Sequence, residues 1–385
     1  MDYQKTRIVK SHPLFILLVA LISNALTAQD EPFVYVLGIA QDAGYPQAGC
    51  YQQHCLAGWE NPALRLGATS IAVVDPETNN KYLFEATPHL PEQLYDLEKV
   101  APDKRYTLDG VFLTHAHMGH YTGLMYFGFE SMNVNNLPVY TMPRMAEFLR
   151  TNGPWSQLVT MDNIKLQALE NRHSVKFSNI TVTPILVPHR DEFSETVGYQ
   201  IDGPNKTALF IPDIDKWEIW DRNILEEIRA VDYALIDATF FNGNELPGRD
   251  MADIPHPFVV ESMSLFESLI AEDKAKVWFI HLNHSNPLIN RDSAAYPEIY
   301  GPEGVYPVAG TAQNGASNEH WPELIAVLEA APPAFVRSRM YWRRRILFHV
   351  IGRRAANPDS KRHELGQWRI TDIASFLMAA PRRRP

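Results

Sequence analysis

The segment Thr114-His115-Ala116-His117-Met118-Gly119-His120 places three histidines at the spacing H-x-H-x-x-H. It directly follows the apolar run at 111–113, which predicts a buried strand, so the histidines are expected on the loop at the carboxyl end of that strand. Neutral imidazole is the protein ligand that zinc-like metals most often bind. Histidine accounts for only 14 of 385 residues, so a metal site explains this spacing better than a surface loop that happens to be rich in histidine.

Four further runs that predict strands also end on, or next to, a His or an Asp. The runs and their polar residues are 180–187 with His189, 207–211 with Asp213, 233–237 with Asp237, and 277–280 with His281. Sites in layered α/β proteins form where the ends of strands converge. A single metal site therefore accounts for the series better than several unrelated structural residues.

The rest of the central chain alternates between strand and helix patterns, which predicts an α/β (α+β) fold. The apolar fraction of 45% and the charged fraction of 21% are those of a globular protein. The further predicted strands are 33–38, 70–74, 81–85, 110–114, 137–140 and 196–201, and the predicted helices are 91–100, 121–129, 142–151, 217–230 and 259–271.

The amino terminus has the layout of a secretory signal peptide, residues 1–28. Basic residues precede an apolar run at 14–22, and the small residues Ala25 and Ala28 follow it. That run is too short for a comfortable membrane span. We expect a periplasmic or secreted protein without stable membrane insertion after cleavage, with an uncleaved anchor as the alternative.

Charge is spread unevenly between the body of the chain and its end. The net charge is −10, yet residues 336–385 hold 13 Arg or Lys against 3 Asp or Glu. The acidic body argues against nucleic-acid binding and leaves a small-molecule substrate as the expected partner; it says nothing of the oligomeric state. We predict a body at 29–321 and a basic tail at 322–385, which is an appendage that touches an acidic surface or membrane, a disordered segment, or a translation artefact.

Taken together, these motifs resemble the metallo-β-lactamase superfamily of hydrolases, and more narrowly its pyrroloquinoline-quinone (PQQ) biosynthesis protein B branch. The resemblance covers roughly residues 33–287. The segments that carry it, besides the histidine motif, are 44–47 (GYPQ), 85–88 (EATP), 120–124 (HYTGL) and 281–287 (HLNHSNP). It implies a four-layer αββα sandwich with the metals between the edges of the two sheets.

The resemblance also implies a ligand set. His115, His117 and His189 would hold a first metal, while His120 and His281 would hold a second. Asp213 would bridge the two metals, and Asp213 and His281 would be catalytic. Supporting or substitute carboxylates would be Asp215 and Asp237, with a helix cap as the alternative role for Asp215. The expected metal is zinc, one ion or two, with iron or manganese as alternatives.

Two departures from the family pattern stand out. The superfamily usually has Asp immediately before the third motif histidine, where this chain has Gly119. The consequence is one tight metal, a weaker second metal held with a substitute carboxylate, or loss of hydrolysis.

The second departure concerns the cysteines. Relatives carry a structural zinc on a C-x-C-x-x-C cluster plus a distant His. Here we expect Cys50, His54, Cys55 and His284 to bind such a zinc, with a disulfide or two free thiols as the alternatives.

The expected function is that of an exported metal-dependent hydrolase, in which metal-bound hydroxide attacks an ester, phosphodiester or amide. One alternative is an iron-dependent oxygenase or hydroxylase in quinone-cofactor biosynthesis. The other is a metal-binding protein without catalytic activity.

Overall fold

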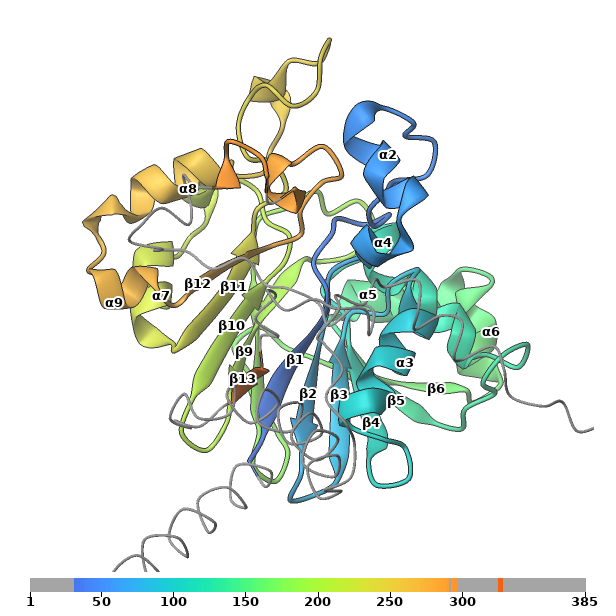
Figure 1. Ribbon diagram of the computed structural model, residues 1–385. Helices are drawn as coiled ribbons and strands as arrows, with labels where there is room; N and C mark the ends of the chain where they lie inside the picture. The colour runs from blue at the N-terminus through green and yellow to red at the C-terminus, as the bar shows by residue number, and fades with distance from the viewer. Residues whose placement is uncertain (1–30, 291, 297–324, 328–385) are drawn as a thin grey trace, which may run out of the picture. The chain divides into compact units, whose positions relative to one another are not determined.

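The computed structural model describes residues 31–290, 292–296 and 325–327 (Figure 1). All of these described residues belong to one compact unit. The predicted signal peptide lies outside the described residues, and so does the predicted basic tail except for residues 325–327. Among the described residues, no helix has both the length and the apolar composition needed to cross a bilayer.

The first sheet has seven strands in the order β13-β1-β2-β3-β4-β5-β6. Its strands are β1 (Phe33–Gly38), β2 (Ser70–Asp75), β3 (Asn80–Phe84), β4 (Thr107–Phe112), β5 (Leu137–Thr141), β6 (Ile164–Ala168) and β13 (Ile325–Val327). Strands β3 to β6 run parallel, whereas β13, β1, β2 and β3 pair antiparallel. Strand β13 lies within the predicted tail, so pairing in this sheet extends past residue 321.

The second sheet has six strands in the order β12-β11-β10-β9-β8-β7. They are β7 (Val175–Lys176), β8 (Thr181–Leu186), β9 (Val197–Asp202), β10 (Thr207–Ile211), β11 (Tyr233–Asp237) and β12 (Val277–Ile280). The predicted hairpin of β9 and β10 is antiparallel, while β10, β11 and β12 run parallel. Parallel strands send their carboxyl ends to one edge of the sheet, which gathers the residues that follow them.

Helices cover the outer face of each sheet, as Figure 1 shows for α3, α5 and α6 on one side and α7, α8 and α9 on the other. The α-helices are α2 (Gln53–Glu60), α3 (Leu90–Val100), α4 (Met118–Tyr121), α5 (Pro143–Thr151), α6 (Trp155–Thr160), α7 (Ile224–Ala230), α8 (Val259–Leu265) and α9 (Ala271–Lys274). Short 3₁₀ turns are η1 (Pro62–Leu64), η2 (Thr122–Phe127), η3 (Trp217–Ile219), η4 (Met251–Asp253), η5 (Phe266–Ser268) and η6 (Pro287–Ile289). The predicted four-layer αββα sandwich is therefore confirmed.

Three predicted helices were wrong in detail. The segment 121–129 is mostly 3₁₀, and 259–271 divides into α8, η5 and the start of α9. The segment 217–230 breaks between η3 and α7, because Asn223 leaves the helical conformation and its side chain accepts a hydrogen bond from the Leu225 N–H, 2.9 Å away. Such a cap starts a new helix where the periodicity alone suggested a continuous one.

An aromatic layer joins the two sheets. Phe84 and Phe112 from the first sheet stack with ring centroids 4.7 Å apart, and Phe84 also meets Tyr199 and Phe210 from the second sheet at 5.3 and 6.3 Å. All four side chains are fully buried. Burying a large side chain stabilises the fold by about 1.5–3 kcal/mol, so this layer holds the two sheet edges, and the loops on them, in a fixed relation.

Candidate metal centre

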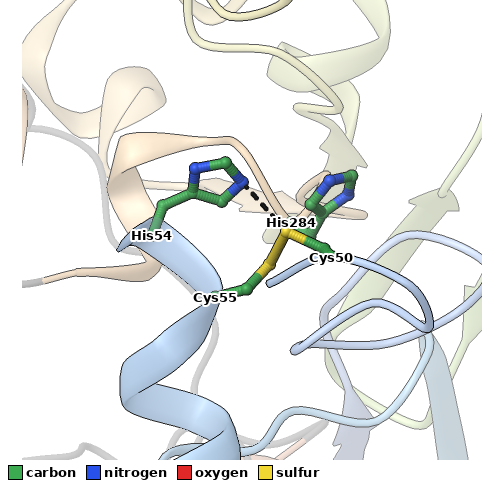
Figure 2. Close-up of side chains that lie close together, drawn as sticks. All are labelled: Cys50, His54, Cys55 and His284. Carbon is green, nitrogen blue, oxygen red and sulfur yellow. Dashed lines mark hydrogen bonds between the residues drawn. A yellow bond between two sulfur atoms is a disulfide. The ribbon is translucent and has the colours of Figure 1, made fainter. Parts of the chain in front are cut away.

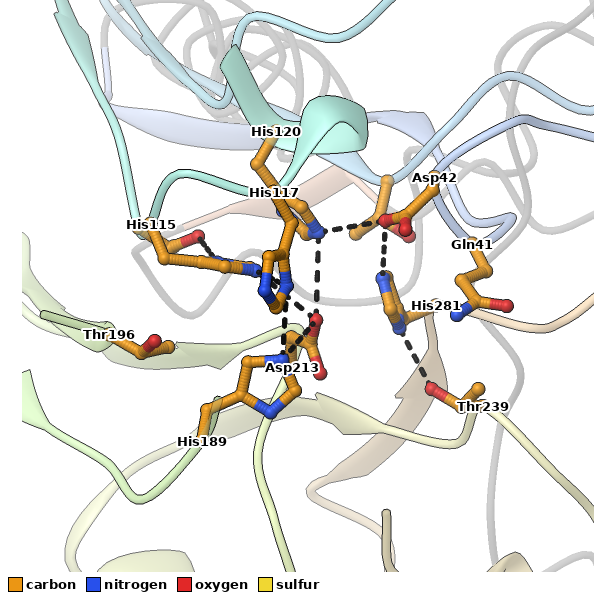
Figure 3. A network of polar contacts seen from close by, with 12 residues as sticks. Gln41, Asp42, His115, His117, His120, His189, Thr196, Asp213, Thr239 and His281 are labelled. Carbon is orange, nitrogen blue, oxygen red and sulfur yellow. Dashed lines mark hydrogen bonds and ion pairs between the residues drawn. The ribbon is translucent and has the colours of Figure 1, made fainter. Parts of the chain in front are cut away.

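The loops at the carboxyl ends of the strands bring all six predicted metal ligands together (Figure 3). The three motif histidines follow β4, His189 follows β8, Asp213 follows β10, and His281 follows β12. In addition, Asp42 enters from the loop after β1, and it was not among the predicted site residues.

The motif loop is held in place by neighbouring strands. The Thr114 carbonyl accepts a hydrogen bond from the Val197 N–H at 3.2 Å, and the Ala116 N–H donates to Ser194 Oγ at 2.8 Å. The His120 carbonyl accepts from the Ala86 N–H at 2.9 Å. These bonds tie the loop to both sheets, so the histidine positions are set by the fold.

A first group of ligand atoms comes from His115, His117, His189 and Asp213, and they all lie within 4.8 Å of one another. His115 Nε2 lies 3.4 Å from Asp213 Oδ2, and His189 Nε2 lies 3.3 Å from the same oxygen. His117 Nδ1 lies 2.8 Å from His115 Nε2 and 3.2 Å from His189 Nε2. Three imidazole nitrogens and one carboxylate oxygen thus face a common point, as in zinc sites.

A second group consists of Asp42, His120 and His281. Asp42 Oδ1 lies 3.1 Å from His120 Nε2 and 3.6 Å from His281 Nε2. His120 Nε2 lies 3.7 Å from Asp213 Oδ2. Asp213 therefore stands between the two groups and contacts both.

Each of the five histidines turns one ring nitrogen toward the centre. The other nitrogen is hydrogen-bonded from behind in four of them, and in His120 it lies at ion-pair distance from Glu85 without a hydrogen bond. Such outer partners fix the orientation and tautomer of histidines that bind metals. The outer pairs are His115 Nδ1 with Thr114 Oγ1 at 2.8 Å, His117 Nε2 with Glu192 Oε2 at 3.0 Å, His120 Nδ1 with Glu85 Oε1 at 3.5 Å, His189 Nδ1 with Asp215 Oδ1 at 2.9 Å, and His281 Nδ1 with Thr239 Oγ1 at 2.9 Å. Five such pairs indicate rings arranged for a ligand at the centre.

Several atoms that face the centre have no hydrogen-bond partner among the described residues. Asp42 Oδ1, His120 Nε2 and His281 Nε2 are all buried in this condition. A buried polar atom without a partner costs about 1–3 kcal/mol. A bound cation would satisfy all three atoms, so the residues present fit a divalent metal.

Electrostatics favour positive charge at this centre. Burial, together with the neighbouring His120, lowers the pKa of His115 well below its usual value. Burial acts in the same direction on His120, but Glu85 and Asp42 outweigh it and hold the pKa of His120 well above its usual value. Asp213 and Asp215 likewise outweigh burial and raise the pKa of His189 to about 10. The buried carboxylates thus require either protonated rings or a bound cation.

Two site residues lie in the left-handed region of the backbone. Glu85 has φ 80° and His281 has φ 63°. Such a conformation costs a residue other than glycine about 1–3 kcal/mol and tends to occur at functional sites. Here it places a fully buried carboxylate and a fully buried imidazole beside His120 and Asp42.

Asp237 and His256 form a layer behind Asp213. Asp237 Oδ1 accepts from the Thr239 N–H at 2.7 Å, and its Oδ2 accepts from the Ile214 N–H at 3.1 Å. His256 Nδ1 lies 2.9 Å from Asp237 Oδ2 and 3.2 Å from Asp213 Oδ1. Sequence reasoning missed His256, because it follows no strand and stands in the irregular Ile-Pro-His-Pro segment at 254–257.

The cysteine cluster lies in a separate place, between α2 and the loop after β12 (Figure 2). Cys50 and Cys55 form a disulfide, which was one of the expected alternatives. His54 Nε2 lies 3.4 Å from Cys50 Sγ, and the rings of His54 and His284 are 5.5 Å apart. Ligand atoms of all four residues lie within 4.8 Å of one another. The set converges as a metal site would, but zinc needs free thiolates, so the structural zinc stays a prediction for the reduced protein.

Known protein families and curated proteins include relatives of this chain. A family model described as the beta-lactamase superfamily domain matches residues 80–282. Coenzyme PQQ synthesis protein B of Acinetobacter baumannii (strain AYE) is 25% identical over 297 residues, which cover 69% of this chain and 94% of the relative. The protein of the same name from Pseudomonas protegens is 24% identical over 298 residues, with the same coverage.

Solved structures show the same fold. Zn(2+)-bound PqqB from Methylobacterium extorquens superposes with a TM-score of 0.59 at 20% identity, covering 72% of this chain and 98% of that one. A diphosphatase from the PhnP family superposes with a TM-score of 0.50 at 19% identity, covering 73% and 95%. At these identities the likeness concerns the fold.

Proposed function

The chain belongs to the beta-lactamase superfamily, and from this premise we propose that it is a metal-dependent hydrolase that resembles coenzyme PQQ synthesis protein B. The observation that carries the proposal is the arrangement of five histidines, each with one nitrogen at the shared centre and the other beside an outer partner, which is hydrogen-bonded in four of the five. A histidine with a purely structural role in the core does not need a ring nitrogen that faces the ring nitrogens of four other histidines.

We propose zinc as the metal, supported by the nitrogen-rich donor set and by the zinc named for the relative from Methylobacterium extorquens. His115, His117, His189 and Asp213 would hold it. When bound, such a metal lowers the pKa of water and polarises the bond under attack.

The protein groups have distinct parts in the proposed reaction. Asp213 Oδ2 lies between His115, His189 and His120 and can orient the attacking water or accept its proton. In a centre that holds the first metal alone, His281 Nε2 faces the opposite side of the same space and can bind the substrate oxygen on which charge develops. The proposed reaction is hydrolysis of an ester, phosphodiester or amide in a small molecule.

The open side of the centre is expected near His117. Its side chain is 14% exposed, whereas those of His115, His120, His189 and His281 are at most 2% exposed. Met118 and Phe193, which neighbour His117 and its partner Glu192 in sequence, are 74% and 60% exposed. A small molecule with an apolar portion could therefore approach from this side.

The test compares metal content and hydrolysis in matched histidine variants. His115→Ala and His117→Ala should lose bound zinc and the hydrolysis of chromogenic phosphodiester and lactone substrates. His173→Ala is the control, because His173 is 70% exposed and, within the described part of the chain, pairs with the surface residue Glu170 and the Asn171 carbonyl. Motif variants that retained zinc as the parent does would refute the proposal.

An iron-dependent oxygenase or hydroxylase is the second candidate, because histidines combined with carboxylates also suit iron. Elemental analysis of natively purified protein separates the two functions. Iron with substrate-dependent oxygen consumption would favour the oxygenase, and zinc without it the hydrolase.

We also propose export to the periplasm or the medium. The support is the layout of residues 1–28 and the Cys50–Cys55 disulfide, since disulfides persist in oxidising compartments. N-terminal sequencing of the exported protein should begin at Gln29, and recovery of residues 1–28 on the mature chain would contradict cleavage.

A further inference from the structure

We propose that Asp42 supplies the metal-binding carboxylate that the histidine motif lacks at Gly119, so that Asp42, His120 and His281 form a second metal position with Asp213 as the bridge. This inference rests on the proposed metal centre. It assigns the missing ligand to a loop about 80 residues earlier in the chain.

The first argument is steric. A Cβ atom added at Gly119 would lie 2.3 Å from Asp42 Cα, 2.4 Å from Asp42 Oδ1 and 2.6 Å from Asp42 Cβ. Real Cβ atoms essentially never approach so closely. Asp42 therefore fills the space that a side chain at position 119 would occupy, and the two positions are complementary.

The second argument is the direction of the carboxylate. Asp42 Oδ1 points at His120 Nε2 and His281 Nε2, 3.1 and 3.6 Å away (Figure 3). All three atoms are buried without a hydrogen-bond partner among the residues described, although the Asp42 side chain as a whole is 40% exposed. A carboxylate that served only to anchor its loop would be bonded to backbone N–H groups.

The third argument is that the other candidate carboxylates are engaged. Asp215 is the outer partner of His189 at 2.9 Å. Asp237 accepts bonds on both oxygens, from Thr239 and from Ile214 and His256. Both are thereby committed to supporting contacts, whereas Asp42 Oδ1 has no hydrogen-bond partner among the described residues.

The loop that carries Asp42 is fastened to the loop that carries His281. The Gln41 N–H donates to the Leu282 carbonyl at 2.8 Å, and the Leu282 N–H donates to the Ile39 carbonyl at 2.8 Å. The Asn283 side-chain amide also donates to Gln41 Oε1. These bonds hold Asp42 against His281 in advance of binding, which reduces the free-energy cost of forming the site.

The decisive experiment counts metal. Parent and variant proteins, with the disulfide intact, are stripped with chelator, reloaded with Zn²⁺ and passed through gel filtration before elemental analysis, and calorimetry then gives the affinities. Asp42→Asn keeps the shape of the side chain and removes its charge. It should bind one zinc fewer than the parent, or bind the second zinc at least about tenfold more weakly.

A second variant tests the same contact by changing Gly119 instead of Asp42. Gly119→Ala should displace Asp42 and cause the same loss of one zinc, although it removes no polar group. The matched controls are Asp221→Asn, an exposed carboxylate, and Gly153→Ala, where an added Cβ meets nothing within 4 Å. Both controls should bind as the parent does.

Thermal unfolding of the metal-free proteins checks that each variant is folded. Full zinc content and unchanged affinity in Asp42→Asn would overturn the inference, as would full content in Gly119→Ala. In either event the proposed function would stand as long as His115→Ala lost the first zinc. If Asp42→Asn, Gly119→Ala and His115→Ala all kept the zinc content of the parent, the metal centre itself would be discarded.

Discussion

Two clusters of potential metal ligands lie on neighbouring loops of this protein, and they are built differently. The main centre has five histidines with outer partners, set on strand ends of two sheets. The cluster of Cys50, His54, Cys55 and His284 has a disulfide at its heart, and His284 Nδ1 is buried with no hydrogen-bond partner among the described residues. Convergence of donors is common to both clusters, whereas hydrogen bonds behind four of the five histidines distinguish the main centre.

The largest expected effect is the removal of a ligand from the main centre. His189→Ala deletes a nitrogen that faces Asp213 Oδ2 at 3.3 Å. Zinc affinity should fall by more than about a hundredfold, since loss of an outer partner alone costs about 10–100-fold. Calorimetry on the metal-free protein measures the change. An unaltered zinc affinity would mean that His189 is not a ligand and that the main centre does not bind zinc as proposed.

A smaller effect is expected when only the support is removed. Asp215→Asn leaves His189 in place but weakens the bond to its Nδ1, so zinc affinity should fall by about 10–100-fold. Glu192→Gln is the matched comparison, because Glu192 is 45% exposed and water competes for its contact with His117. Its effect should stay below about fivefold, and equal effects in the two variants would deny any special role for buried support.

The cysteine cluster should respond to redox state, whereas the main centre should not. Under oxidising conditions, Cys50→Ser should hold as much zinc as the parent, because the joined sulfurs of the parent offer no thiolate and the variant has lost one of the two sulfurs. After reduction, the parent should bind one additional zinc, whereas Cys50→Ser should bind no additional zinc. If zinc analysis showed the additional ion in oxidised protein as well, the disulfide would not describe the working state.

Stability offers a further, modest contrast. The disulfide closes a short loop with a sequence separation of 5, so its loss should lower the free energy of unfolding by about 2 kcal/mol. Denaturant unfolding of Cys50→Ser against the oxidised parent measures this value. A larger loss would show that the cluster also braces the loop of His281, which lies three residues before His284.

Much of the fold could be predicted from local pattern. The strands β1, β2, β3, β8 and β11 lie close to where alternation and apolar runs placed them, since both are properties of adjacent residues. Strands β6 and β7 and helices α2 and α6 were missed. Strand β6 has only one buried residue and β7 only two residues, so neither carries a strong apolar signal.

The predicted ligands could be found because each follows a strand, and strand polarity carries such residues to one edge. Glu85 ends the predicted strand 81–85 and Asp42 comes after the predicted strand 33–38, but neither was assigned to the site, and His256 follows no strand. Glu85 depends on a left-handed backbone at the end of β3, and His256 on a loop that folds back behind Asp213. Their roles depend on contacts between distant segments.

By itself, the sequence determined the histidine motif and the order of most strands and helices, and its resemblance to the superfamily implied the sandwich with metals between the sheet edges. Only the tertiary structure decided what the glycine at position 119 means. In sequence it is the loss of a carboxylate. In space it is the room that Asp42 occupies, because a loop fastened to the far sheet by backbone hydrogen bonds brings that side chain to His120 and His281. No local pattern encodes such a contact, since it arises only when the two sheets pack.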